Sequence, residues 1–202
     1  MKKFFISILA ACLVVICSGG SAFAASQTPA AQTADKTAPS YDMKGQSVVD
    51  LQQLQKKFVD LAGAIPAEKY TWRPGEGVRS ISEIFLHVAA ANYTIPALMG
   101  VTKPAGFDGK TYEKSTTDKA KVIEQLNKTF DVAIASVQAM SNADFAKAEK
   151  SLGPDANDGD VVYILVTHAH EELGIAIAYA RVNGVVPPWT AQALKDAAKA
   201  KQ

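Results

Sequence analysis

The fold is decided by one stretch, residues 160–184, which reads DVVYILVTHAHEELGIAIAYARVNG. Apolar side chains occupy nearly every side of a helix built from these residues, a distribution typical of a helix buried within a larger bundle. Gly184 is well placed as a C-terminal cap, and Pro187-Pro188 prevents the helix from continuing. The sequence therefore predicts a long core helix from about residue 160 to residue 183.

Three other segments repeat apolar residues at helical spacing. The first covers about 45–65 and the third about 115–140. The second opens at Ser80, an N-cap residue followed three positions later by Glu83, which is the pattern of a capping box. The apolar positions of the three segments are Val48, Leu51, Leu54, Phe58, Leu61 and Ile65, then Ile81, Ile84, Phe85, Val88 and Ile95, then Val122, Leu126, Phe130, Ala133, Val137 and Met140.

The rest of the chain is expected to form the connections between these four segments and a C-terminal extension. Residues 100–114 and 141–158 show no apolar period and are expected to be loops, and a short amphipathic helix is expected from Thr190. No segment alternates polar and apolar residues as strands do, and no internal repeat is present. Four long helices in 202 residues predict an all-α fold, a four-helix bundle with a short C-terminal helix.

The N-terminus has the pattern of a secretory signal peptide over residues 1–24. Two lysines precede an apolar run at 4–16, and Ala-Phe-Ala at 22–24 supplies the small residues for cleavage before Ala25. The run is shorter than the roughly 20 residues that a membrane span needs. A lipoprotein alternative would lipidate Cys12, which lies inside the apolar run. The sequence favours a periplasmic or secreted protein with no stable membrane anchor.

Composition excludes several classes of function. Residues 25–44 are rich in Ala, Thr, Ser, Gln and Pro and are expected to form a flexible spacer before a bundle domain at 45–202. Both cysteines, Cys12 and Cys17, leave with the signal peptide, so the exported chain has no disulfide, thiolate nucleophile or cysteine metal ligand. Lys+Arg 21 nearly balance Asp+Glu 20, which argues against a nucleic-acid partner.

Histidine and glutamate side chains mark a candidate site in the bundle. His168 and Glu172 are four residues apart and share a helix face, whereas His170 points roughly 200° away from His168. An imidazole and a carboxylate in an apolar stripe are costly unless they pair with each other or bind something. A third ligand from a facing helix would complete a set that can hold a transition metal, and the remaining histidine, His87, lies in the second helical segment. Glu83 lies four residues before His87, but its place in the capping box explains it without a metal.

A hydrogen-bonded His168–Glu172 pair without a metal remains the alternative at this point. Four further residues that often occur in ligand sites are expected to have structural roles. Trp72 and Trp189 are expected to pack at loop edges, and Arg79 and Arg181 to be surface charges.

Two motifs resemble the DinB/YfiT-like superfamily, the damage-inducible helical-bundle family rather than the DNA polymerase that shares its name. Residues 79–89, RSISEIFLHVA, are similar to its helix-two signature, and residues 168–188, HAHEELGIAIAYARVNGVVPP, to its helix-four signature. The family usually has His-x3-His, then a Gln, and a closing Arg-x-x-Gly-x-x-Pro. The resemblance covers 45–189 and implies a four-helix bundle of DinB/YfiT type in which His87 and His168 are metal ligands.

Two positions depart from the family pattern inside the site. Glu172 stands where the second helix-four histidine is expected, and Ile175 where Gln is common. Glutamate is a competent oxygen ligand, and two histidines with one carboxylate form a known transition-metal set. The resemblance therefore implies one divalent transition ion, such as zinc, nickel or iron, held by His87, His168 and Glu172. The two departures leave open a site that is retuned or one that is degenerate.

The function implied is a metal-dependent hydrolase that uses a metal-activated water on an unknown small-molecule substrate. The resemblance also suggests a thiol-dependent transferase. This activity is disfavoured outside the cell because low-molecular-weight thiols are principally cytosolic. The alternative is a non-catalytic periplasmic binding or stress-associated bundle with a degenerate metal site. Whether the chain is an enzyme stays open, and no residue stands out as a general base. Relatives often dimerise, so a homodimer is also an expectation.

Overall fold

A computed structural model describes residues 42–201 of the chain. The expected signal peptide at 1–24 therefore lies outside the described residues, as does nearly all of the expected spacer at 25–44. Residues 42–201 contain no β-strand, and a single isolated bridge joins Ala148 and Asn157. The expectation of an all-α fold is confirmed.

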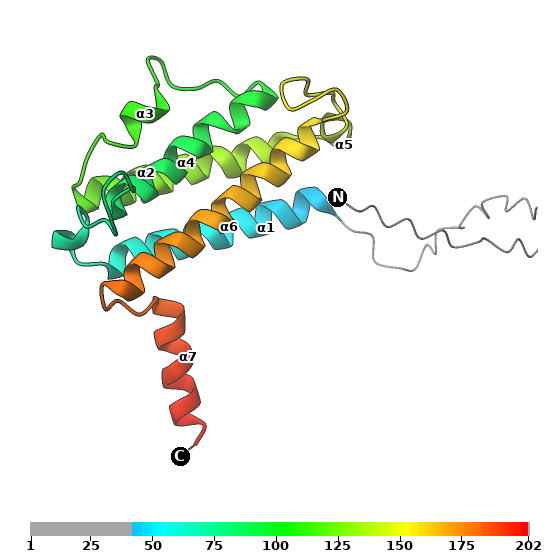
Figure 1. Ribbon diagram of the computed structural model, residues 1–202. Helices are drawn as coiled ribbons and strands as arrows, with labels where there is room; N and C mark the ends of the chain where they lie inside the picture. The colour runs from blue at the N-terminus through cyan, green and yellow to red at the C-terminus, as the bar shows by residue number, and fades with distance from the viewer. Residues whose placement is uncertain (1–41, 202) are drawn as a thin grey trace, which may run out of the picture. The chain divides into compact units, whose positions relative to one another are not determined.

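Four long helices form the bundle (Figure 1). They are α1 (Met43–Ala64), α2 (Ile81–Thr94), α4 (Lys119–Ala139) and α6 (Asp158–Val182). Shorter elements fill the connections, and they are η1 (Ala67–Lys69), η2 (Pro96–Met99), α3 (Gly109–Tyr112) and α5 (Asn142–Phe145). The chain then ends in α7 (Pro188–Lys199).

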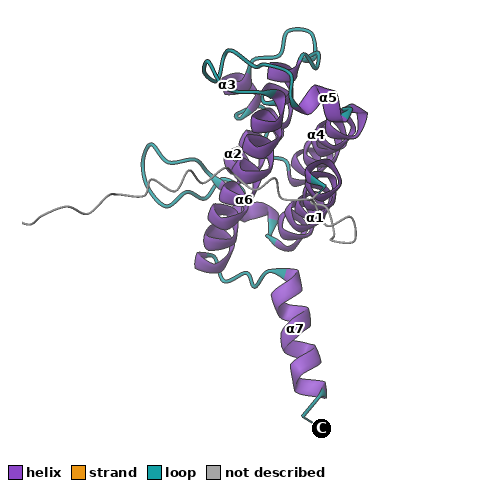
Figure 2. Ribbon diagram, turned by 90° about the vertical axis from the view of Figure 1, so that its right-hand side faces the viewer, coloured by secondary structure: helices purple, strands orange, loops and turns teal. Residues whose placement is uncertain are grey.

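Each long helix packs against two others. Helix α1 contacts α4 and α6, and α2 contacts the same two helices, so that α1 lies diagonally opposite α2. Figure 2 shows α2 beside α6 and α1 beside α4. The contact between α2 and α6 matters most for function, because it places the two segments that carry the histidines side by side.

Aromatic rings fill the centre of the bundle. Phe58 of α1 lies 5.6 Å from Phe130 of α4 and 6.3 Å from Phe85 of α2, measured between ring centroids. Tyr70 is also fully buried, and its hydroxyl donates to the carbonyl of Ala62 at 2.8 Å. Aromatic pairs contribute about 0.5–1.5 kcal/mol each beyond their area burial. This core rigidly positions the backbone of α2 on which the site is built.

Three helices start earlier than the apolar periods indicate, two of them at a polar cap. Helix α1 begins at Met43 because Asp42 caps it by accepting from the backbone N–H of Gly45 at 3.0 Å. A Cβ at position 45 would lie 2.5 Å from Asp42 Oδ2, so a larger residue would require the capping carboxylate to shift. Helix α6 begins at Asp158 because Asn157 is its N-cap. Helix α7 begins at Pro188 rather than Thr190, since proline suits the first turn of a helix.

The expected end of α6 agrees with the structure. Gly184 has a φ of 78°, a left-handed conformation that glycine adopts without strain, and it follows the last residues of the helix. Helix α6 is also long and apolar enough to cross a membrane by length and composition alone. In this fold its buried face packs against α1 and α2, as the core helix of a bundle does.

Both segments expected to be loops contain one turn of helix. Asp108 caps α3 by accepting from the backbone N–H of Thr111 at 2.8 Å, and Ser141 with Asp144 forms a capping box around α5. A single turn is too short to show an apolar period, so its capping residues are the only sequence signal.

Helix α7 projects from the bundle (Figures 1 and 2) and has no buried residue. Trp189 packs at its base, where Lys57 Nζ lies 5.9 Å from the ring centroid, and its partly buried side chain meets the core. The expected packing role of Trp189 agrees with this position.

Candidate metal centre

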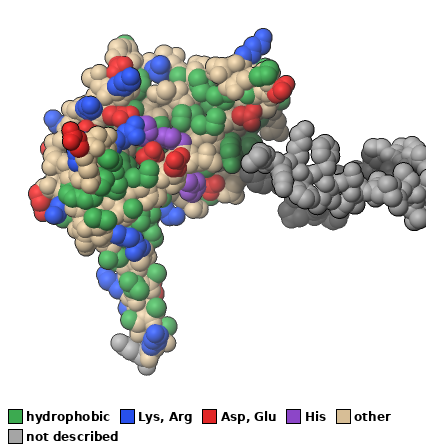
Figure 3. Space-filling model, viewed as in Figure 1, with side chains coloured by type: hydrophobic (Ala, Val, Ile, Leu, Met, Phe, Trp, Pro, Cys, Tyr) green, Lys and Arg blue, Asp and Glu red, His purple; other side chains and the backbone are tan. Residues whose placement is uncertain are grey.

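The candidate site lies where α2 meets α6. His87 is in the middle of α2, and His168 and Glu172 are one turn apart on α6. The Glu172 side chain is only 9% exposed, and the two histidine side chains are 21% and 22% exposed. Figure 3 shows that histidine side chains reach the surface on this face, with acidic and basic side chains around them. The site is thus set into the bundle with one side open.

The three side chains direct their donor atoms toward one point. Nε2 of His87 lies 3.1 Å from Nε2 of His168 and 3.5 Å from Oε1 of Glu172, and the third edge, from His168 Nε2 to Glu172 Oε1, is 4.0 Å. Zn–N bonds of about 2.0–2.1 Å at a tetrahedral angle separate two ligand atoms by about 3.3 Å. The observed edges bracket that separation.

Burial disfavours charge on the ligands of this site. It raises the pKa of Glu172 above its ordinary value, and it lowers the pKa of His168, an effect to which neighbouring His87 adds. Nitrogen atoms of both imidazoles and a carboxylate oxygen of Glu172 lie within 4.8 Å of one another in a half-buried space. A proton on one of the two Nε2 atoms can satisfy the 3.1 Å contact between the imidazoles, and two imidazoles with one carboxylate also form a ligand set that fits a divalent ion.

Glu113 is a member of the site that the sequence did not reveal. It follows α3 in the connection between α2 and α4, and its Oε1 accepts from the ring Nδ1–H of His87 at 2.6 Å. Arg79 donates two hydrogen bonds to the same carboxylate. Its Nε lies 3.0 Å from Oε2 and one Nη lies 3.4 Å from Oε1. Although partial burial opposes it, the hydrogen bonds from Arg79 and His87 hold the pKa of Glu113 below its ordinary value.

The sequence did not indicate Glu113 because the segment that contains it has no apolar period. Without such a period, the orientation of its side chain could not be predicted. Arg79 was expected to be a surface charge, and the structure instead gives this half-exposed side chain a specific carboxylate partner. Arg181, by contrast, is exposed as expected.

Other residues weighed from the sequence lie outside the cluster. His170 is exposed on the far side of α6. Glu83 closes the capping box by accepting from the backbone N–H of Ser80 at 2.7 Å, and it pairs with Arg73 at 3.1 Å. Trp72 packs edge-on against Tyr179 with the ring centroids 5.3 Å apart. The capping and packing interpretations of Glu83 and Trp72 therefore agree with the structure.

A surface hollow adjoins the cluster and is called here the Arg79–Tyr179 hollow. It has a volume of 520 Å³. Ile84 and Ile175 on its wall lie one turn from His87 and Glu172, respectively, so the hollow begins where the cluster ends. Its lining residues are Gly77, Val78, Arg79, Ile84, Ile175 and Tyr179.

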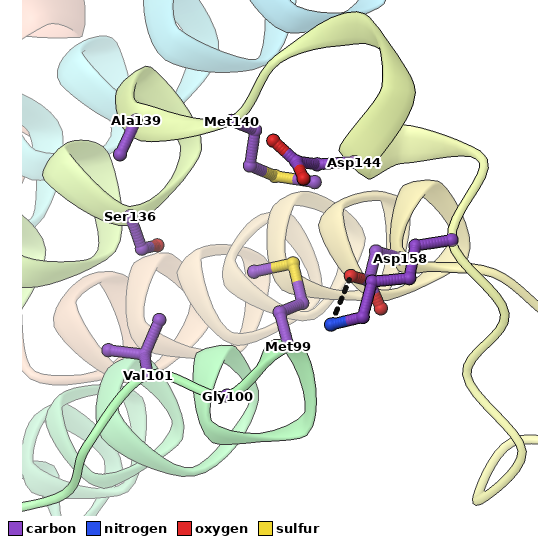
Figure 4. A pocket seen from close by; sticks show the side chains of 9 residues that line it. Met99, Gly100, Val101, Ser136, Ala139, Met140, Asp144 and Asp158 are labelled. Carbon is purple, nitrogen blue, oxygen red and sulfur yellow. Dashed lines mark ion pairs between the residues drawn. The ribbon is translucent and has the colours of Figure 1, made fainter.

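Two further cavities involve different parts of the bundle. One, of 250 Å³, is lined by Met99, Met140 and Asp158 among others, and Figure 4 shows the ion pair between Asp158 and Lys147, 3.7 Å long, at its side. The other, of 410 Å³, lies beside Phe107 and Tyr112. No cluster residue lines any of the three cavities, but only the Arg79–Tyr179 hollow has lining residues one helical turn from the cluster.

Solved structures share this fold. A DinB-like protein from Bacillus cereus ATCC 10987 matches with a TM-score of 0.62 and 12% identity, over 71% of this chain and 95% of that one. YfiT from Bacillus subtilis, described as a probable metal-dependent hydrolase with an unusual four-helix bundle topology, matches with a TM-score of 0.58 and 13% identity, over 75% of this chain and 93% of that one.

Sequence comparison gives the family. No curated protein matches the chain significantly. The family profile of the DinB superfamily matches residues 50–176, a range that holds α2, most of α6 and all three residues of the cluster. The chain therefore belongs to the DinB superfamily.

Proposed function

We propose that this chain is an exported metal-dependent hydrolase in which His87, His168 and Glu172 hold one divalent transition ion. The observation that carries the proposal is the convergence of two Nε2 atoms and one carboxylate oxygen within 4.8 Å. Zinc, nickel and iron all accept two imidazoles and a carboxylate. The description of YfiT as a probable metal-dependent hydrolase supports the same class of activity.

Each residue would have a distinct part in such a centre. The two neutral imidazoles would supply lone pairs without charge, and the buried carboxylate would supply one negative charge. When bound, the ion supplies Lewis acidity and lowers the pKa of water. Three protein ligands leave positions free, as catalytic rather than structural sites do.

The Arg79–Tyr179 hollow is the place for a small substrate. Its wall combines apolar Val78, Ile84 and Ile175 with two polar groups, the guanidinium of Arg79 and the hydroxyl of Tyr179. Burial raises the pKa of Tyr179, with the charge of Glu172 adding to the effect, so this hydroxyl stays protonated near neutral pH and can donate a hydrogen bond.

Export rests on the sequence pattern of residues 1–24. Cleavage after Ala24 would release a chain that starts at Ala25, and the intact mass or N-terminal sequence of the exported protein tests this. A lipidated species that begins at Cys12 would contradict it.

A second candidate function is a non-catalytic bundle with a degenerate site. The specific observation in its favour is Ile175, whose apolar side chain lies at the hollow and is 37% exposed where the family commonly has Gln. A polar group that could orient a substrate or water is missing at that position.

Metal content and turnover separate the two candidates. The mature protein should purify with one equivalent of a transition metal by elemental analysis, and should hydrolyse at least one member of an ester and amide panel. Replacing His87, His168 or Glu172 by Ala should abolish stoichiometric metal, whereas His170→Ala should retain it. A protein that purifies metal-free and shows no thermal shift with zinc, nickel or iron would overturn the hydrolase proposal. Bound metal without turnover would favour the non-catalytic bundle.

A further inference from the structure

We propose that Glu113 is a positioning residue that fixes the ring of His87, and that Arg79 holds Glu113 in place for this task. The inference deepens the proposed function, because it assigns the control of one metal ligand to the connection between α2 and α4. It rests on the proposed metal site only in part, since the proton position on His87 can be measured without metal.

The two ring nitrogens of His87 have different partners and therefore different roles. Nδ1 lies 2.6 Å from Oε1 of Glu113, while Nε2 faces His168 and Glu172 at 3.1 Å and 3.5 Å. An ionised carboxylate can only accept a hydrogen bond, so the proton of a neutral His87 sits on Nδ1. Nε2 is then left with a free lone pair that points into the cluster. A carboxylate on the outer nitrogen of a ligating histidine also makes the ring a better donor.

Arg79 gives the carboxylate a fixed orientation. Its Nε contacts one carboxylate oxygen at 3.0 Å, and one of its terminal nitrogens contacts the other at 3.4 Å. The oxygen nearest His87 thus receives hydrogen bonds from two directions. Arg79 directly precedes Ser80, the N-cap of α2, so the group that anchors Glu113 lies next to the start of the helix that carries His87.

The connection that carries Glu113 is itself packed in place. The neighbouring Tyr112 lies 5.3 Å from Phe107 and 6.1 Å from Tyr93 of α2 between ring centroids. Asp108 caps the turn of α3 immediately before it. Glu113 therefore approaches His87 from an ordered backbone rather than as a free surface side chain.

Two simpler roles for Glu113 make different predictions. As a surface ion pair with Arg79, Glu113 would affect stability alone. As a metal ligand it would have to face the cluster, but its oxygen lies on the opposite side of the ring from Nε2. A positioning role alone predicts that the proton on His87 moves when Glu113 is removed.

The test compares Glu113→Ala with Glu83→Ala. Glu83 is a matched control because its side chain, 17% exposed, is also paired with an arginine and lies one turn before His87 on α2. Nitrogen NMR of the imidazoles in the metal-free mature protein should show His87 protonated on Nδ1 in the wild type and in Glu83→Ala. Glu113→Ala should lose that preference, and Glu113→Gln, which retains an accepting oxygen, should restore it in part.

Zinc affinity gives the second readout. Competition with a chromophoric chelator should show Glu113→Ala weakened by about 10–100-fold, as loss of an outer-shell carboxylate typically causes, and Glu83→Ala within about twofold of wild type. Arg79→Met, which leaves the Glu113 carboxylate without its anchor, should fall between the two and serves if Glu113→Ala does not fold. Unchanged His87 tautomer and unchanged zinc affinity in the Glu113 and Arg79 variants would overturn the proposal. If the wild type bound none of zinc, nickel and iron, the metal proposal would fail, and the tautomer would still decide the role of Glu113.

Discussion

The α1–α4 side of the bundle and the α2–α6 side are built on different principles. Where α1 meets α4, the facing residues are large, apolar and almost completely buried, as with Leu54, Phe58, Leu126 and Phe130. Where α2 meets α6, the seam includes two imidazoles, a buried carboxylate and the small residue Ala176, which lies beside Ile84 and Phe85 of α2. The α1–α4 side stabilises the fold through apolar burial. The α2–α6 side contributes less stability because part of its buried surface is formed by the polar side chains of the site.

Truncating the apolar side should have the largest effect on the bundle. Phe130→Ala removes a ring that contacts Phe58 and should lower the free energy of unfolding by about 3–5 kcal/mol. Urea denaturation measures the change. Tyr163→Ala, at a position 62% exposed on α6, is the control and should alter stability by less than about 1 kcal/mol. A small loss in Phe130→Ala would mean that the two sides do not differ as described.

Metal should stabilise the polar side through its own ligands. At a free zinc concentration one hundred times the dissociation constant, binding to the folded state alone adds about 2.7 kcal/mol to the free energy of unfolding. Thermal melts should show this gain in wild type and in His170→Ala but not in His168→Ala. An equal zinc-dependent shift in His168→Ala would place the ion elsewhere.

The metal-free polar side should improve when its buried charge is removed. Glu172→Leu replaces a 9%-exposed carboxylate by an apolar group of similar size. We expect the metal-free variant to be about 1 kcal/mol more stable than wild type, because burying an ionised group without a cation is unfavourable. Chemical denaturation in the presence of a chelator checks this, and Glu171→Leu at an exposed position is the control. A large destabilisation would show that the carboxylate already has a structural partner.

The smallest effect concerns the connection that links the two sides. Burial raises the pKa of Tyr112 from 10.0 to about 12, and nearby Tyr93 adds to the effect. The folded state thus holds this proton more tightly than the unfolded state, so the stability it contributes is complete below pH 10.0 and is lost as the pH rises through about 12. Tyr112→Phe cannot ionise and should lose less stability over that interval in denaturant titrations, whereas Tyr163→Phe should behave like wild type.

The sequence predicted the parts of this fold that depend on apolar period. All four long helices were expected because their buried faces recur every three to four residues, as in the run from Leu51 to Leu61. The one-turn helices α3 and α5 were missed since a single turn is shorter than the period that would reveal it. The early starts of α1 and α6 depend on Asp42 and Asn157, whose polar side chains act through the backbone.

The candidate site was likewise predictable only in part from the sequence. His168 and Glu172 share a face by spacing alone, and His87 was added through the family resemblance, and the structure brings the three together. Glu113 could not be placed in this way. Its direction is set by packing of Tyr112 on Phe107 and Tyr93 and by the distant Arg79, contacts that only the folded chain creates.

The adjacency of α2 and α6 also fixes the order in which the site can be assembled. His87 and His168 are separated by 81 residues along the chain, so the entropy of closing that long loop must be overcome before their nitrogens meet. Contacts of this range form late in folding, whereas each helix can form locally. A chain that has just been synthesised offers only the neighbouring pair on α6, and the full ligand set exists once α2 has docked. If the proposed ion binds, its tight uptake would therefore report that folding is complete, and its release would report that α2 and α6 have come apart.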